Sequence, residues 1–123
     1  MHIAIASSGQ TLDAPIDARF GRAAFFLIAD SVSLAFTVHP NPAIQHSGGA
    51  GIAACQYLVG EGAEAVVAGQ LGPNAMRVLE SADVALFQGI GGTVRDNVIA
   101  CNEGKLEALT QSGPAHVGKG SAV

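Results

Sequence analysis

The sequence is poor in charged residues, and above all in positive charge. Only six of its 123 residues are Lys or Arg, charged residues make up 13%, and the formal net charge is −4. Proteins that bind nucleic acid neutralise its phosphates with clustered Lys and Arg, so this balance argues against a nucleic-acid partner. Long apolar runs are missing as well, because no stretch approaches the roughly 18 residues that a membrane span needs. We therefore expect neither a nucleic-acid nor a membrane partner.

Cysteine is also scarce. Cys55 and Cys101 are the two cysteines, and they form no Cys-x-x-Cys pair. Structural zinc or iron–sulfur sites usually need three or four soft ligands, which two distant thiols do not supply. Both cysteines are predicted to be core residues, since Cys55 shares an apolar helix face with Ile52 and Val59 and buried free cysteine is common. If a metal cluster binds here, the protein is not expected to supply its sulfur.

A secretory signal is not visible at the N-terminus, where no basic segment precedes an apolar one. A cytoplasmic protein is therefore expected. Hydrophobic residues make up 49% of the chain, which suffices for one domain with a sizeable core. Residues 1–109 are predicted to form that domain. Residues 110–123, which are rich in Gly, Ser and Ala, are predicted to be a flexible tail.

The chain alternates between short apolar strands and amphipathic helices. Apolar and β-branched residues predict five strands, at 2–6, 24–29, 34–39, 65–68 and 84–87. Apolar residues at helical spacing predict three helices, which begin near residues 50, 73 and 93 and end near residues 60, 82 and 102. The predicted order is β-β-β-α-β-α-β-α.

The connections predict how the strands pair. The short link between the second and third strands favours an antiparallel hairpin, and the first strand is also expected to pair antiparallel with the second. Right-handed crossovers through the first two helices make the last three strands parallel. The prediction is a three-layer α/β/α fold around a mixed five-stranded sheet, which resembles the ribonuclease H-like motif. The first, third, fourth and fifth strands then end at one edge of the sheet, where α/β proteins tend to bind ligands.

Glycine-rich turns collect at that edge. Segments 46–51 (HSGGAG) and 69–74 (GQLGPN) each lead into a predicted helix, and the turn before the third helix contains Gly91 and Gly92. A helix that starts at glycine presents free backbone N–H groups and the positive end of its dipole, which together suit an anion. Arg19 and Arg22 lie in a loop that begins and ends at the same edge, and arginine offers a permanent charge with forked donors. A small anionic ligand is therefore predicted.

Three segments resemble a known family. They are 17–23 (DARFGRA) before an apolar strand, the helix entry at 46–51, and 67–75 (VAGQLGPNA). In this order and spacing they are similar to the dinitrogenase iron–molybdenum cofactor biosynthesis domain family, over roughly residues 1–109. The resemblance implies a small α/β/α domain that holds an oxygen-sensitive metal–sulfur cluster non-covalently, as a carrier or assembly partner. Nothing is fused to the domain in this sequence, so it looks like a stand-alone member.

The implied ligand is a molybdenum-containing metal–sulfur cluster, either Mo–Cu–S or Mo–Fe–S, in an anaerobic setting. The expected partners are this inorganic anionic cluster and the proteins that assemble or accept it, and a monomer is expected. His46 is a candidate metal ligand or cluster contact, although it could equally be a polar loop residue that caps the next helix. The expected cofactor-binding residues are Arg19, Arg22, His46, Gly48, Gly49, Gly51, Gly69, Gly72, Pro73, Asn74, Gly91 and Gly92.

Other function classes stay open on the residues alone. Glycine turns at helix starts serve phosphate equally well, so a small phosphate- or nucleotide-binding enzyme or a regulatory binding module is the alternative. Against it, the chain has neither a Gly-x-x-x-x-Gly-Lys-Ser/Thr segment nor dinucleotide spacing in its glycines. A metal-dependent nuclease would need a cluster of carboxylates to bind its metal ions. A pure protein-interaction module has no sequence signature by which it could be recognised. No catalytic residue is predicted, so we expect a binding protein that is not an enzyme.

Overall fold

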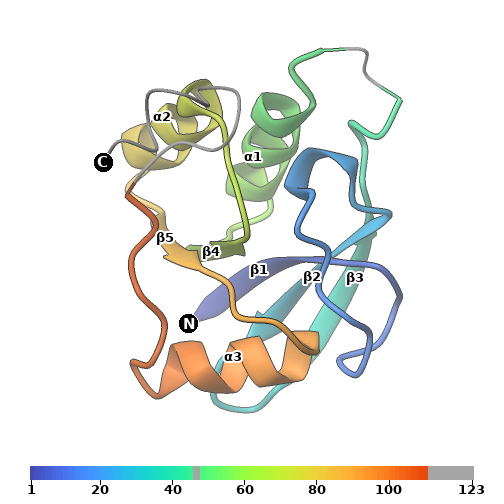
Figure 1. Ribbon diagram of the computed structural model, residues 1–123, viewed down its shortest axis with the longest axis vertical. Helices are drawn as coiled ribbons and strands as arrows, with labels where there is room; N and C mark the ends of the chain where they lie inside the picture. The colour runs from blue at the N-terminus through green and yellow to red at the C-terminus, as the bar shows by residue number, and fades with distance from the viewer. Residues whose placement is uncertain (46–47, 111–123) are drawn as a thin grey trace.

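The computed structural model describes residues 1–45 and 48–110 and shows one sheet between two layers of helix (Figure 1). Helices α1 and α2 lie on one face of the sheet and α3 lies on the other. The strands are β1 (His2–Ser7), β2 (Phe25–Asp30), β3 (Phe36–Pro40), β4 (Ala65–Ala68) and β5 (Ala85–Gln88). The helices are α1 (Ala50–Gly60), α2 (Pro73–Ser81) and α3 (Val94–Asn102), with a short 3-10 helix, η1 (Phe20–Arg22).

The sheet has the strand order β3-β2-β1-β4-β5. Strand β2 pairs antiparallel with both β1 and β3, while β1 pairs parallel with β4 and β4 with β5. The predicted mixed five-stranded sheet and its α/β/α layers are confirmed. Strands β1, β3, β4 and β5 consequently end at the same edge, which we call the carboxyl edge.

Element boundaries differ from the prediction by one or two residues, and backbone turns explain the differences. The third strand begins at Phe36 because Leu34 adopts a left-handed conformation (φ 65°) in the turn that follows β2. Strand β5 begins at Ala85 because the N–H of Val84 donates to the carbonyl of Leu79 in the turn that follows α2. The short helix η1 was not predicted. The predicted tail lies outside the described residues, apart from Thr110.

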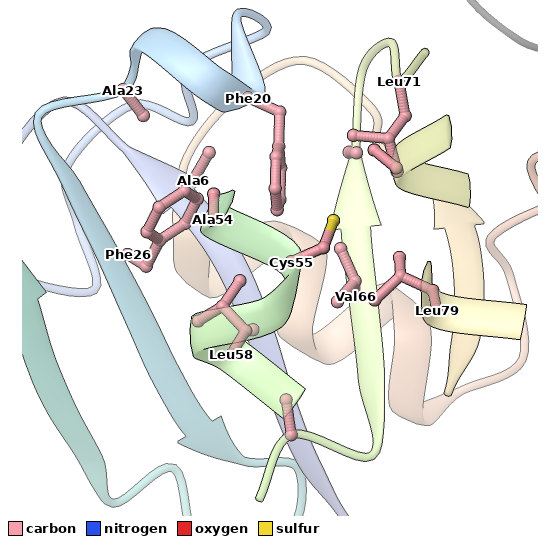
Figure 2. Packing of buried hydrophobic residues seen from close by; sticks show 14 of the residues in the cluster. Ala6, Phe20, Ala23, Phe26, Ala54, Cys55, Leu58, Val66, Leu71 and Leu79 are labelled. Atoms are coloured by element: carbon pink, nitrogen blue, oxygen red, sulfur yellow. The ribbon is translucent and has the colours of Figure 1, made fainter. Parts of the chain in front are cut away.

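Two hydrophobic clusters hold the layers together, one on each face of the sheet. Strand β1 serves both, because Ile3 and Ile5 face α3 while Ala4 and Ala6 face α1. Alternation along a strand that is buried on both faces produces this arrangement. Figure 2 shows the larger cluster, in which α1 packs against the sheet beneath η1. Its fully buried side chains include Phe20, Phe26, Leu58, Val66 and Leu79.

Cys55 and Cys101 are both buried, as predicted. Cys55 is fully inaccessible and lies in the same cluster as Phe20 and Val66 (Figure 2). Burial raises the pKa of the Cys55 thiol from its usual 9.0 to about 12, and it also raises the pKa of Cys101. Both thiols are therefore protonated at neutral pH, which makes them poor metal ligands.

Among residues 1–45 and 48–110, no helix has the length and apolar character needed to cross a bilayer.

Candidate functional site

A cleft of about 500 Å³ opens at the carboxyl edge. It lies where η1, the first turn of α1 and the loop between β4 and α2 meet, so three segments far apart in sequence build it. A volume of this size falls within the range of about 300–1,000 Å³ typical of small-ligand sites. The residues that line the cleft are Ala18, Arg19, Phe20, Gly21, Arg22, Ala50, Gly51, Gln70, Leu71 and Gly72.

Close backbone approaches between these segments require small residues. A Cβ atom on Gly21 would lie 2.9 Å from the backbone nitrogen of Gly51, so η1 rests directly on the first turn of α1. A Cβ atom on Gly69 would lie 3.1 Å from the Cα of Ala18, at the point where Arg19 and Gln70 form an isolated parallel bridge. The glycines therefore bring main-chain groups to the surface of the cleft, as a close backbone approach to a ligand requires.

Helices α1 and α2 both start at the cleft. Helix α1 begins after Gly49, which adopts a left-handed conformation (φ 69°), and α2 begins after Gly72 with Pro73 in its first turn. Within the described residues, neither helix start has a side-chain cap or an acidic residue in its first turn. A Cβ atom on Gly51 would lie 3.6 Å from that of Ala75, so the two helix starts are neighbours. Their unsatisfied N–H groups and dipoles together favour an anion.

The start of α3 is different, because its own side chains occupy it. Thr93 accepts a hydrogen bond from the N–H of Asp96, and the Asp96 carboxylate accepts one from the N–H of Thr93. These two hydrogen bonds form a capping box, as the spacing of Thr93 and Asp96 in the sequence indicates. Gly92 has a φ of 106°, its carbonyl accepts a hydrogen bond from the N–H of Ile16, and with Gly91 it lies on the α3 side of the sheet. Gly91 and Gly92 do not line the cleft.

Arg19 and Arg22 both reach the cleft but differ in their surroundings. The Nε and Nη2 atoms of Arg19 donate to the two carboxylate oxygens of Asp17, each at 3.3 Å. Arg22 Nη1 donates to the carbonyl of Ile44 at 3.4 Å, and both arginine side chains are exposed. The cleft therefore carries two guanidinium groups beside two helix starts, a combination of N–H donors that suits an anion.

Asn41 ties η1 to the loop that precedes α1. Its buried side chain donates to the carbonyls of Gly21 and Ala23, at 3.1 and 2.9 Å, and accepts from the N–H of Ala43 at 2.8 Å. Two of these bonds hold η1 and its C-cap residue, and the third holds the loop that carries Asn41. Asn41 was not among the predicted site residues, because nothing in the sequence shows which carbonyls its amide will meet.

The other predicted site residues differ in whether they line the cleft. Gly48 and Gly49 precede α1 without lining the cleft, whereas Gly51 and Gly72 line it. Pro73 and Asn74 form the first turn of α2, where Asn74 Oδ1 accepts a hydrogen bond from Arg77 at 2.6 Å. His46 lies outside the described residues.

Several residues that line the cleft were not among those predicted. They are Ala18, Phe20, Gly21, Ala50, Gln70 and Leu71. All six fall inside the three segments on which the family resemblance rests, so the segments themselves were the available signal. The predicted set contained the arginines and several glycines of these segments but omitted Gly21, Gln70 and the apolar lining residues.

A third arginine, Arg95, also lies at the carboxyl edge but belongs to α3. Its Nε donates to the carboxylate of Asp13 at 3.0 Å. This hydrogen bond, with the charge of the guanidinium, lowers the pKa of Asp13 below its usual value. Arg95 therefore fastens the loop after β1 to α3, and it does not line the cleft.

Fold and cleft together define a small α/β protein whose sheet edge presents two uncapped helix starts and two arginines. A family model described as dinitrogenase iron-molybdenum cofactor matches residues 1–104. The chain belongs to this family, as the sequence resemblance implies.

Solved structures agree with this assignment. The apo form of the orange protein from Desulfovibrio gigas is 35% identical, with a TM-score of 0.83, over 89% of this chain and 92% of that one. An NMR structure assigned as a NifB protein from Thermotoga is also 35% identical, with a TM-score of 0.75, over 91% of this chain and 98% of that one. A structure from Methanocaldococcus jannaschii assigned as a dinitrogenase is 17% identical with a TM-score of 0.64, which shows the shared fold alone. A comparison with curated proteins gave no significant match.

Proposed function

We propose that this protein binds a preformed, molybdenum-containing metal–sulfur cluster in the cleft and carries it without catalysing a reaction. The observation that carries the proposal is the meeting of two uncapped helix starts with Arg19 and Arg22 around one cleft. Metal–sulfur clusters of this kind are anionic, and the protein as a whole has a net charge of −4. Long-range attraction is therefore weak, and local N–H donors must hold the ligand.

The residues of the cleft favour a cluster whose metals are already ligated by sulfide, so that no protein thiolate is needed. Neither cysteine lines the cleft, and no group of three or more His, Cys, Asp or Glu side chains within residues 1–45 and 48–110 could hold a metal ion. A cluster that needed protein thiolates would find no ligands among these residues. His46 stays a proposed metal ligand or cluster contact, since it belongs to the segment that leads into α1.

Membership of an iron–molybdenum cofactor family and 35% identity to the orange protein support a cofactor-related role. Whether copper or iron accompanies the molybdenum is a matter for experiment. Proteins that assemble or accept the cluster are the expected partners. Phosphate or a nucleotide is the second candidate, because the same N–H groups and arginines suit a phosphate group.

The test is anaerobic titration of the purified protein with tetrathiomolybdate, alone and with Cu(I) or Fe(II), followed by absorption spectroscopy and metal analysis. We expect a protein-bound species with new absorption in the visible range and close to one cluster per chain after gel filtration. Calorimetric titrations with inorganic phosphate, ATP and NAD run in parallel.

Micromolar binding of ATP or NAD, without retention of molybdenum, would replace the carrier with the nucleotide-binding alternative. Retention of molybdenum by a protein in which Arg22 and Gly51 are both substituted would place the ligand outside the cleft.

A further inference from the structure

Asp17 forms an ion pair with Arg19, one of the two arginines of the cleft. Its carboxylate accepts three hydrogen bonds from Arg19, one from the backbone N–H at 2.9 Å and two from the side chain at 3.3 Å. The Asp17 side chain is 12% exposed, whereas that of Arg19 is 75% exposed. The carboxylate is therefore held in the protein surface while the guanidinium remains open to solvent.

Both residues are anchored by their backbones, so the pair is a fixed feature of the edge. The N–H of Asp17 donates to the carbonyl of Ala6 at the end of β1, and Arg19 forms a parallel bridge with Gln70 beyond β4. Asp17 thus occupies a set position between the end of the central strand and the cleft.

The geometry of the pair matters for an anionic ligand. Arginine binds an anion with paired acceptor atoms, such as a carboxylate or a phosphate, best through two parallel N–H donors, and Asp17 occupies one such fork, made by Nε and Nη2. An incoming anion must displace the carboxylate or use the remaining donors. The bonds at 3.3 Å are longer than the roughly 2.7–2.9 Å of strong charge-assisted pairs, and exposed ion pairs are weak. Displacement is therefore feasible, but it leaves a negative charge beside the ligand.

We propose that Asp17 lowers the affinity of the cleft for its anionic ligand by competing for Arg19, and thereby makes the ligand releasable. The proposal rests on the proposed function, because it concerns the same cleft and the same ligand. A carrier that must pass on its cluster gains from such a competitor, since the release rate sets most differences in affinity.

The test compares Asp17→Asn with Asp13→Asn in anaerobic titrations with tetrathiomolybdate. Asparagine keeps the oxygen that accepts the Arg19 backbone N–H but removes the charge. Asp13 is the matched control, because it belongs to the same loop and also pairs with an arginine Nε, that of Arg95, away from the cleft. We expect Asp17→Asn to bind about three- to ten-fold more tightly than the wild type, with release slowed by a similar factor, and Asp13→Asn to leave affinity unchanged.

Two further variants separate the charge effect from a folding effect. In an Arg19→Ala background, Asp17→Asn should tighten binding by much less, because the competition works through the Arg19 guanidinium. Arg19→Ala by itself supplies the baseline for that comparison. Loss of fold cannot produce tighter binding. An increase in the affinity of Asp17→Asn for tetrathiomolybdate is therefore the result that decides between the two effects.

Unchanged or weaker binding by Asp17→Asn, with normal binding by the wild type, would overturn the inference and leave the proposed function intact. In that case Asp17 would orient Arg19 toward the ligand. Failure of the wild type to bind the probe would overturn both.

Discussion

Gly21 and Gly51 approach each other so closely that a Cβ atom on Gly21 would lie 2.9 Å from the backbone nitrogen of Gly51. One residue belongs to η1 and the other to the first turn of α1, and 30 positions of sequence separate them. This contact sets the distance between Arg22 and the start of α1. It therefore controls the geometry of the whole cleft.

Gly21→Ala should open the cleft and destabilise the protein. The added methyl group would also meet the Cβ of Ala50 at 3.2 Å, so backbone has to move. Insertions of this kind cost about 1–3 kcal/mol, which thermal or urea unfolding would measure. Binding of tetrathiomolybdate should weaken as well. Gly60→Ala is the control, since a Cβ there meets nothing within 4 Å; equal stability and affinity for the two variants would contradict the prediction.

Arg22→Ala should weaken binding of the cluster anion by about ten- to a hundred-fold. Charge-assisted hydrogen bonds from arginine contribute roughly 1.5–3 kcal/mol where water is excluded, and this range corresponds to that loss of affinity. Rising salt should weaken the wild type too, because both arginines are exposed. Lys105→Ala should change little, since Lys105 follows α3 and pairs with Glu103 at 3.0 Å. If both variants bound the anion equally well, the ligand would not occupy the cleft.

Replacement of both Cys55 and Cys101 by Ser should leave cluster binding in place. The thiols are buried and protonated, so any loss should follow from core destabilisation of about 1–3 kcal/mol caused by buried hydroxyl groups. Metal analysis of the folded double variant, with circular dichroism as the check on folding, tests this. A folded variant that holds no cluster would show that thiolates are the anchor.

The raised pKa of Cys55 has a consequence for stability at high pH. The thiol titrates near 9.0 when unfolded and near 12 when folded, so the folded state holds the proton more tightly. Its contribution to stability is complete below about pH 9 and is lost as the pH rises toward 12. Unfolding midpoints measured between pH 8 and 11 should fall less steeply in Cys55→Ala than in the wild type. Parallel curves for the two proteins would contradict this.

Asn41→Ala should reduce both stability and affinity, whereas Asn97→Ala should reduce stability alone. Each buried amide makes three hydrogen bonds to backbone, but Asn41 holds η1 and Asn97 holds the turn before α3. A buried group left unpaired costs about 1–3 kcal/mol, so both variants should unfold at lower denaturant concentration. Titration of both variants with tetrathiomolybdate, under conditions where each is folded, separates the two effects. If Asn41→Ala and Asn97→Ala bound the anion equally well, Asn41 would have no role in the site.

The sequence by itself determined the layers, the order of the elements along the chain and the edge at which the loops gather. Periodicity predicted the elements, and antiparallel pairing of the first three strands with right-handed crossovers after them predicted the strand directions, because these features depend on neighbours along the chain. The order of the strands across the sheet was not predicted and comes from the structure. The capping box at Thr93 and the left-handed Gly104 (φ 72°) were predictable for the same reason.

Only the tertiary structure decided which parts of that edge form a cleft. Gly91 and Gly92 share the edge with Gly51 and Gly72 but lie by α3, on the opposite face of the sheet from α1 and α2. Contacts such as those of Asn41 with Gly21, or Gly51 with Ala75, join residues far apart in sequence, so the local sequence pattern cannot predict them. Local sequence features predicted that the glycine-rich turns and the arginines lie at one edge of the sheet. Long-range packing determined which of these residues line the cleft.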